Sequence, residues 1–117
     1  TMSNSGLPYP IRCTETECDQ IALPGVPLGS FPDITYDEVT IPLARGDVFV
    51  FCTDGISETM NAEGAEFGTR RVLEIVGAHR RETARGLVDA IFDAATAFRG
   101  HAPQHDDMTA VAVKITT

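Results

Sequence analysis

Long apolar runs are missing from this chain, and so is any excess of basic charge. No hydrophobic stretch approaches the roughly 18 residues that a membrane-spanning helix needs. Residues 1–10 also lack the basic flank and the apolar stretch of a secretory signal peptide. Lysine and arginine number 9 against 17 acidic residues, whereas a protein that binds a nucleic-acid backbone needs clustered basic residues. We therefore expect no membrane segment and no nucleic-acid partner.

Cysteine is also scarce, with three in the chain: Cys13, Cys18 and Cys52. The odd count, together with the lack of a signal peptide, favours a reducing compartment. Cys13 and Cys18 form a C-x4-C pair, but no second pair is present to complete a four-ligand zinc site. We therefore interpret both as ordinary thiols and expect the protein to be cytoplasmic.

The composition is that of a globular protein with a core. Hydrophobic residues make up 43% of the 117 residues and charged residues 22%, which fits one domain or a large piece of one. The formal net charge is −8. This charge suits a protein that binds divalent cations, and equally an acidic surface that serves only solubility.

The pattern of apolar residues predicts strands in the first half. Short apolar stretches at residues 10–12 and 20–23 are candidates for edge strands. Apolar and other residues alternate over 38–43, which predicts a half-buried strand. The unbroken apolar run 48–52 is typical of a strand covered on both faces. The turn residues at 44–47 predict that these last two strands form a hairpin.

Helical spacing follows in the second half. Apolar residues within 72–76 give a short helical face that stops near Gly77. Residues 84–98 repeat apolar side chains at helical spacing, and Gly100 ends the run. Residues 108–115 alternate as a final strand does. The order strand, strand, helix, helix, strand predicts layers of sheet and helix.

Acidic residues stand at the ends of two predicted strands. Asp54 directly follows the apolar run, and Asp106 and Asp107 directly precede the last strand. Carboxylates at strand ends are held by rigid backbone, and Gly55 permits a sharp turn after Asp54. If the two strands are neighbours, their carboxylates can converge, and oxygen ligands favour Mg²⁺ or Mn²⁺ over zinc. On spacing alone, an ordinary Asp-Gly turn and a capped loop explain the pattern better.

Three blocks of sequence stand in order along the chain: Val-Pro-Leu-Gly at 26–29, Arg-Gly-Asp-Val-Phe-Val-Phe-Cys-Thr-Asp-Gly-Ile-Ser-Glu at 45–58, and Pro-Gln-His-Asp-Asp-Met-Thr at 103–109. Together they resemble the sporulation stage II E branch of the metal-dependent protein phosphatases of type 2C. Asn-Ala-Glu-Gly at 61–64 and the helix through 87–90 fit the same spacing. The resemblance covers nearly the whole chain, and its specificity comes from the ordered set.

The resemblance implies an α+β fold, a β-sandwich of two sheets flanked by helices. It also implies two divalent cations, Mn²⁺ or Mg²⁺, whose bound water attacks the phosphorus of phosphoserine or phosphothreonine. By motif, Asp54 and Asp106 would be metal ligands, and Asp107, which is Asp or Asn across the class, would orient the site. Gly55 and Thr109 would be structural support. We expect the carboxylates of Asp54 and Asp106 to lie about 4–7 Å apart, given metal–metal spacings of about 3.5–4 Å.

The chain also departs from the family pattern. Residues 3–6, Ser-Asn-Ser-Gly, resemble an earlier strand end that the family continues with His, where this chain has Leu7. Nothing before Asp54 resembles the family's further metal-binding motifs, and a full domain is longer. We therefore expect residues 1–117 to be the C-terminal portion of one phosphatase domain. Its metal site would be incomplete, and a missing N-terminal half or a partner chain would cover an apolar sheet face.

Two functions follow from the resemblance. The first is a protein serine/threonine phosphatase that acts on a phosphorylated regulatory protein, such as an anti-sigma-factor antagonist, with the fragment alone inactive. The alternative is a non-catalytic phosphatase-like module that binds proteins in a partner-switching signalling pathway. Acidic motifs in the missing half would favour the enzyme. A receiver domain is disfavoured because its acidic pair precedes the phosphoacceptor, and aspartyl phosphatase chemistry is disfavoured because position 52 is Cys.

Overall fold

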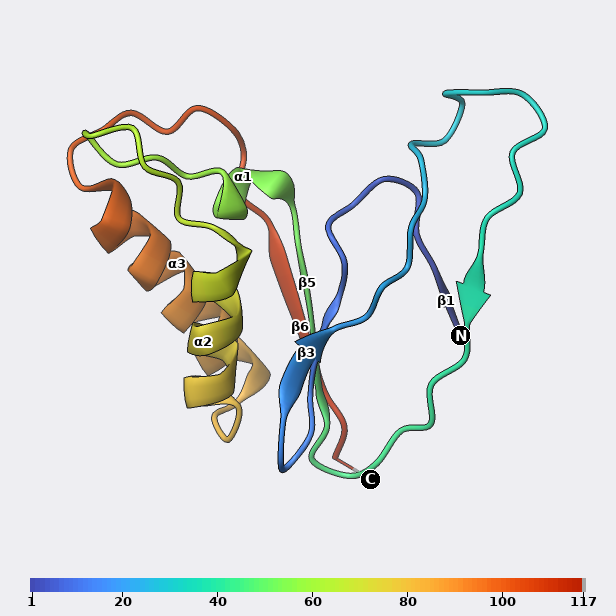
Figure 1. The fold of residues 1–117 in the computed structure, drawn as a ribbon. Coiled ribbons are helices and arrows are strands. Elements are labelled where there is room, and N and C mark those ends of the chain that lie inside the picture. The colour runs from blue at the N-terminus through green and yellow to red at the C-terminus, as the bar shows by residue number, and fades with distance from the viewer. Residues whose placement is uncertain (117) are drawn as a thin grey trace.

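A four-stranded antiparallel sheet with strand order β3-β2-β5-β6 forms the centre of the molecule (Figure 1). The computed structural model describes residues 1–116. The sheet consists of β2 (Ile11–Cys13), β3 (Cys18–Gln20), β5 (Val48–Cys52) and β6 (Ala110–Lys114). A separate small sheet pairs β1 (Met2–Ser3) with β4 (Glu38–Val39). The helices are α1 (Asp54–Ser57), α2 (Thr69–His79) and α3 (Ala84–Arg99).

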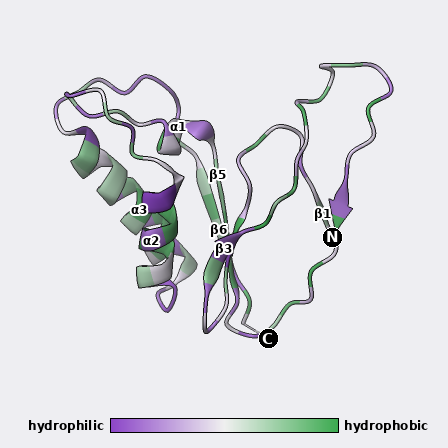
Figure 2. Ribbon diagram, viewed as in Figure 1, coloured by the Kyte–Doolittle hydropathy of each residue, from purple (hydrophilic) through white to green (hydrophobic). Residues whose placement is uncertain are grey.

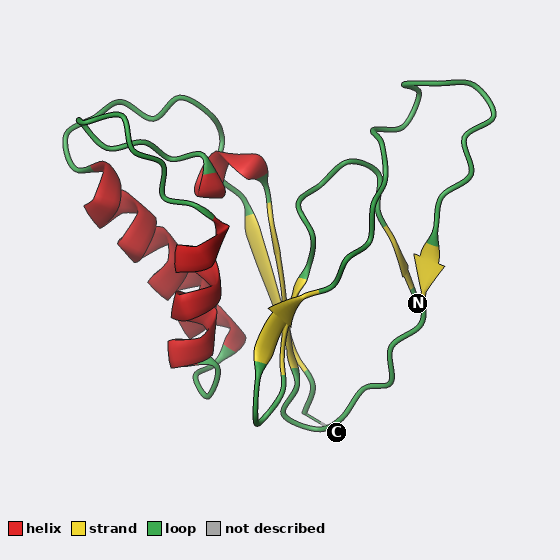
Figure 3. Ribbon diagram, viewed as in Figure 1, coloured by secondary structure: helices red, strands yellow, loops and turns green. Residues whose placement is uncertain are grey.

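Helices α2 and α3 cover one face of the central sheet (Figure 3). The apolar stripe of α3 buries Leu87, Ile91 and Ala95, as its helical spacing predicts. Thr83 caps the helix by accepting a hydrogen bond from the Gly86 N–H at 3.0 Å. Helix α3 therefore forms where the sequence predicts it, but the predicted end of α2 near Gly77 is wrong. The helix continues to His79, because Gly77 does not adopt the left-handed conformation of a helix-ending glycine. Within residues 1–116, no helix is long and apolar enough to cross a membrane.

The core lies between these helices and the sheet. It joins the apolar stripes of α2 and α3 to one side of β2 and β5, which contribute Ile11, Cys13, Val48 and Val50. Because alternate residues of a strand point to opposite faces, the other side of β5 presents Phe49 and Phe51 away from the helices.

The strands β5 and β6 consist mostly of hydrophobic residues (Figure 2), and the helix-free face that they share is only partly covered. Val111 is 51% exposed and Val113 42% exposed. Beside them, a cavity of about 210 Å³ is lined by residues that include Phe51 and Leu43. We call this surface the open face (Phe51, Val111 and Val113); Phe49 lies on the same side of the sheet but is buried. The predicted exposed apolar sheet face is therefore confirmed, while what covers it stays a prediction.

Two predictions for the first half of the chain are wrong. The strand predicted over 38–43 is limited to β4, and it pairs with β1 rather than forming a hairpin with β5. The reason is that both edges of β5 are already paired, with β2 and with β6. Pro42 also has no N–H to donate to a ladder. The stretch at 10–12 belongs to an internal strand, β2, and not to an edge.

The interpretation of Cys13 and Cys18 as ordinary thiols is also wrong. They are paired opposite each other in the β2–β3 hairpin and are joined by a disulfide. A hairpin places directly opposite Cβ atoms about 4.5–5.5 Å apart, which the C-x4-C spacing alone does not reveal. The cysteine count therefore no longer argues for a reducing compartment, and a cytoplasmic location stays a prediction. Cys52 is free, and burial raises the pKa of its thiol to about 11.

Candidate metal centre

The pairing of β5 with β6 brings the two acidic segments to the same end of the sheet. The strands are antiparallel, and Cys52 at the end of β5 lies opposite Ala110 at the start of β6. Asp54 therefore begins α1 directly beyond β5, while Asp106 and Asp107 lie in the loop that enters β6. The two strands are therefore neighbours, which is the condition under which the carboxylates of the two segments can converge.

Two threonines extend the ladder beyond the last strand pair. The Thr53 N–H donates to the Thr109 carbonyl at 3.0 Å, and the Thr109 N–H donates to Thr53 Oγ1 at 3.0 Å. Thr53 and Thr109 are 56 residues apart in sequence. These bonds therefore hold the segment of Asp54 against the segment of Asp107.

Gly55 provides the closest approach between the two segments. It is buried, and a Cβ atom at this position would lie 1.9 Å from the carbonyl oxygen of Asp107. Real Cβ atoms essentially never approach an atom within 3.0 Å, so any side chain at residue 55 would push the segments apart. The glycine of the Asp-Gly dipeptide is thus required by the contact with Asp107. The sharp turn predicted after Asp54 is wrong, because Gly55 lies within α1 and has no positive φ.

The loop before β6 is tied to the end of α3. Arg99 Nη1 donates to Gln104 Oε1 at 2.9 Å, and Gln104 Nε2 donates to the Asp106 carbonyl at 2.9 Å. The Asp107 N–H donates to Asp106 Oδ1 at 2.7 Å. The side chains of Asp54, Asp106 and Asp107 are all exposed, so their remaining carboxylate oxygens face solvent and are free to take a cation.

The donor chemistry fits a hard divalent cation, but the number of donors does not fill its coordination shell. Mg²⁺ prefers about six oxygen ligands, and a carboxylate supplies one or two. Across residues 1–116, no group of three or more His, Cys, Asp or Glu side chains is arranged to hold a metal ion. The described part of the chain therefore offers part of a site. The separation predicted for the Asp54 and Asp106 carboxylates stays a prediction.

A cavity of about 130 Å³ is lined by Asp106 and its loop on one side and by Gly55 of α1 on the other. Glu58, Glu66 and Arg99 contribute to its lining. Arg99 Nε is buried and has no hydrogen-bond partner among the described residues. No pattern in the sequence marks Glu58, Glu66 or Arg99 for a role. Their only signal is that Glu58 closes the Asp-Gly-Ile-Ser-Glu block and that Arg99 directly precedes the helix-ending Gly100.

Comparison with known proteins places the chain in a family. The family model described as Stage II sporulation protein E (SpoIIE) matches residues 1–116. No match was found among curated proteins. Among solved structures, the chain is similar to the SiaA-PP2C domain of Pseudomonas aeruginosa, with 24% sequence identity and a TM-score of 0.77. That match covers 92% of this chain and 42% of the other.

Two structures of SpoIIE from Bacillus subtilis are also similar. Its PP2C phosphatase domain with a fragment of the regulatory domain has 19% identity and a TM-score of 0.78, over 97% of this chain and 33% of that one. Its phosphatase domain presoaked with Mn has 17% identity and a TM-score of 0.72, over 95% and 48%. The chain thus spans less than half the length of these three structures. The predicted α+β fold of the type 2C phosphatase kind, present in part, is confirmed.

Proposed function

This chain belongs to the stage II sporulation protein E (SpoIIE) family, and on that premise we propose that it is the C-terminal portion of a metal-dependent protein serine/threonine phosphatase domain. The observation that carries the proposal is the β5–β6 pairing, which sets Asp54 and the Asp106–Asp107 loop at one end of the sheet. Family membership supports a phosphatase domain. Catalysis, metal and substrate are the proposed part.

In this proposal, Asp54 and Asp106 are ligands of Mn²⁺ or Mg²⁺, and Asp107 orients the site. Two such cations would lower the pKa of a bound water and neutralise charge on the phosphoryl oxygens. The chain's own contribution is to position the carboxylates. Thr109 and Gly55 serve that purpose, because the threonine bonds and the Gly55–Asp107 contact leave the acidic segments little freedom to separate.

The remaining ligands would come from the rest of the domain. Two carboxylates hold one cation weakly and cannot fix two cations at a spacing of about 3.5–4 Å. The same remainder, or a partner chain, would cover the open face. We therefore expect residues 1–117 alone to be inactive and the intact protein to be active.

The proposed substrate is a phosphorylated regulatory protein, such as an anti-sigma-factor antagonist, with phosphoserine or phosphothreonine as the reacting group. This part of the proposal rests on the family resemblance of the three sequence blocks. A catalytic domain needs open access to the carboxylates, and the exposure of Asp54, Asp106 and Asp107 is compatible with a protein substrate.

One observation favours the second candidate, a non-catalytic module that binds a protein partner. Leu7 stands where the family has His. A module that had lost its site would keep the fold and the open surfaces without the cations. The two candidates differ in the Mn²⁺ dependence of the intact protein.

The test is a Mn²⁺ titration of phosphatase activity on a phosphoserine peptide, for the intact protein and for residues 1–117. Asp54→Asn and Asp106→Asn should each abolish most activity of the intact protein, since each replaces a charged ligand by a neutral group of similar shape. Asp107→Asn should cost about tenfold or less, since Asn serves at that position in the wider class.

Asp93→Asn is the matched control, because Asp93 is an exposed aspartate on α3 outside the candidate centre. An intact protein that keeps full activity as Asp106→Asn would overturn the metal assignment. An intact protein without Mn²⁺-dependent activity would favour the binding module. Turnover by residues 1–117 alone would show that the site is complete without further ligands.

A further inference from the structure

A cavity of about 540 Å³ lies at the end of the sheet away from the candidate metal centre. It is bounded by Lys114, which pairs with Val48 at the start of β5, whereas Asp54 follows the far end of that strand. Five strand residues place these two ends about 13 Å apart, at about 3.3 Å per residue. We call this cavity the basic groove (Thr14, Thr16, Arg80, Arg81 and Lys114).

Positive charge is concentrated in the basic groove against the trend of the whole chain. The chain has 9 lysine and arginine residues against 17 acidic ones, yet three of the nine line this cavity. Glu15 is the one carboxylate among the lining residues. The groove therefore carries a local excess of positive charge on a protein whose net charge is −8.

The two arginines of the groove are not engaged by the protein. Within residues 1–116, neither Arg80 nor Arg81 makes a side-chain hydrogen bond or an ion pair. Arg80 and Arg81 lie in the turn between α2 and α3, and arginines on the two flanking helices are engaged, since Arg70 pairs with Glu74 at 3.3 Å and Arg85 pairs with Asp89 at 3.2 Å. A guanidinium has five N–H donors in a planar fork that matches an oxyanion, and these two forks are free to bind one.

Lys114 is fixed in place by the backbone that carries the arginines. Its Nζ donates to the Glu82 carbonyl at 2.9 Å and to the Arg81 carbonyl at 3.2 Å. An ammonium has three donors, so one remains for a ligand. These bonds also tie β6 to the turn between α2 and α3, which keeps the cations in a constant relation to one another.

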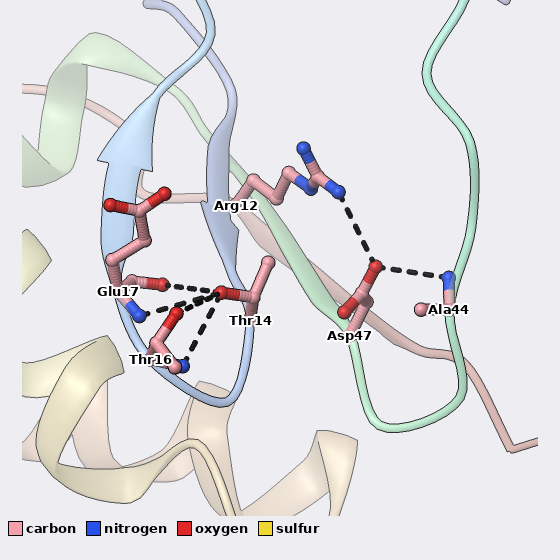
Figure 4. A network of polar contacts seen from close by, with 6 residues as sticks. All are labelled: Arg12, Thr14, Thr16, Glu17, Ala44 and Asp47. Atoms are coloured by element: carbon pink, nitrogen blue, oxygen red, sulfur yellow. Dashed lines mark hydrogen bonds and ion pairs between the residues drawn. The ribbon is translucent and has the colours of Figure 1, made fainter.

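The opposite wall is a closed hairpin loop, shown in Figure 4. The Thr14 N–H donates to the Glu17 carbonyl at 2.8 Å, and the Cys13–Cys18 disulfide joins the strands directly below the loop. The contacts of Thr14 Oγ1 are long, at 3.4 Å, so its hydroxyl can turn to a better partner.

The nearby Asp47 does not neutralise the groove. Its Oδ2 accepts a hydrogen bond from the Ala44 N–H at 3.0 Å and lies 3.6 Å from Arg12 Nη2 (Figure 4). Asp47 is buried, and its negative charge is balanced by Arg12 and by the hydrogen bond from Ala44, so it is not available to the groove cations. Among the residues that line the groove, Glu15 is the one with a carboxylate, and the carboxylate of Glu82, next to Arg81, pairs with His79.

We propose that the basic groove binds a phosphate-type oxyanion, either free phosphate or a phosphoryl group carried by a protein. A dianion suits three cations and one carboxylate better than a single negative charge does. Arginine forks bind its oxygens in bidentate geometry, and threonine hydroxyls supply neutral donors. The groove is separate from the candidate metal centre, and the proposal does not depend on phosphatase activity.

The experiment uses the intact protein, made metal-free with a chelator so that the candidate centre does not retain phosphate through a cation. Inorganic phosphate is titrated and followed by calorimetry and by amide chemical shifts. Parallel titrations use a phosphoserine peptide and its unphosphorylated serine counterpart. The variant is Arg80→Gln with Arg81→Gln. The matched control is Arg70→Gln with Arg85→Gln, which changes the net charge equally on the two helices that flank the turn.

The groove variant should bind phosphate at least about tenfold more weakly, as loss of a charge-assisted hydrogen bond predicts, while the control changes less than about twofold. Amide shifts should appear at Gly46 and in the Thr14–Glu17 loop. Preference for the phosphopeptide would identify a phosphorylated protein as the source, and equal affinity would identify the free anion. Equal losses in both double variants, shifts confined to Asp106 and Asp107, or no saturable binding would each overturn the proposal.

Discussion

Replacing Gly55 by Ala tests the contact that joins the two halves of the candidate metal centre. The new Cβ would start 1.9 Å from the Asp107 carbonyl oxygen and 2.8 Å from its carbon, whereas ordinary contact begins at 3.4 Å. The segments would therefore have to separate by about 1.5 Å, and the obstacle is backbone that cannot rotate away. Overpacking of this kind costs about 1–3 kcal/mol, and we expect the upper end of that range.

The separation should also weaken the threonine bonds between Thr53 and Thr109, which lie next to the new side chain. Each such hydrogen bond contributes about 0.5–1.5 kcal/mol net. We therefore expect Gly55→Ala to lower the free energy of unfolding of the intact protein by about 3–5 kcal/mol. Urea unfolding measures this loss, and calorimetry with Mn²⁺ should show weaker binding, because the two acidic segments no longer meet.

Gly77→Ala is the matched control. It makes the same chemical change inside α2, where the new Cβ would meet Cys18 Sγ at an ordinary 3.5 Å. Alanine is favoured over glycine in a helix by about 0.8–1.0 kcal/mol, so this variant should be slightly more stable than the parent. If Gly55→Ala unfolds at the same urea concentration as the parent and binds Mn²⁺ equally well, the tight contact with Asp107 does not hold the centre together.

Three further predictions concern other parts of the chain. Residues 1–117 alone should bind a hydrophobic dye through the open face, and Val113→Ser should reduce that binding. In the intact protein, where the face is covered, Val113→Ser should instead lower the free energy of unfolding by about 1–2 kcal/mol. A dye signal that Val113→Ser leaves unchanged would contradict this prediction. Reduction of the Cys13–Cys18 disulfide should lower stability by about 2 kcal/mol, as the entropy of a short closed loop predicts, and Cys13→Ser with Cys18→Ser should remove the response to reductant. Burial raises the pKa of Cys52 from 9.0 to about 11, so iodoacetamide should alkylate this thiol about a hundredfold more slowly than an exposed thiol at neutral pH. The alkylation rate should rise toward pH 11. Rapid alkylation of the folded protein at pH 7 would contradict the burial of this thiol.

Local patterns were sufficient to predict α3, the middle of α2 and the two strands that form the candidate centre, but not α1 or the end of α2. Helix α3 follows from its apolar spacing and its terminal Gly100. Strand β5 follows from an unbroken apolar run. These signals are local because each element is determined by neighbours within a few residues. For the same reason the placement of Asp54 beyond β5 could be predicted from sequence.

Pairing between distant segments could not be predicted in the same way. The hairpin between 38–43 and β5 was wrong because the choice of partner depends on which strands compete for an edge, and β2 and β6 occupy both edges of β5. The disulfide was missed because a C-x4-C spacing does not show that the two cysteines lie opposite each other in a hairpin. The basic groove was missed because Arg81, Lys114 and Thr14 come together only when helix, strand and hairpin are placed in three dimensions.

The pairing of β5 with β6 also has a consequence for how the protein is made. Residue 53 and residue 109 bond to each other although 56 residues separate them, so one wall of the candidate centre is synthesised long before the other. While the ribosome adds α2 and α3, β5 has an unpaired edge that exposes its N–H and C=O groups. Non-local pairing of this kind closes slowly. If translation stops before Ala110, β5 therefore keeps an unpaired edge that can pair with other chains and aggregate, and such a chain would need a chaperone.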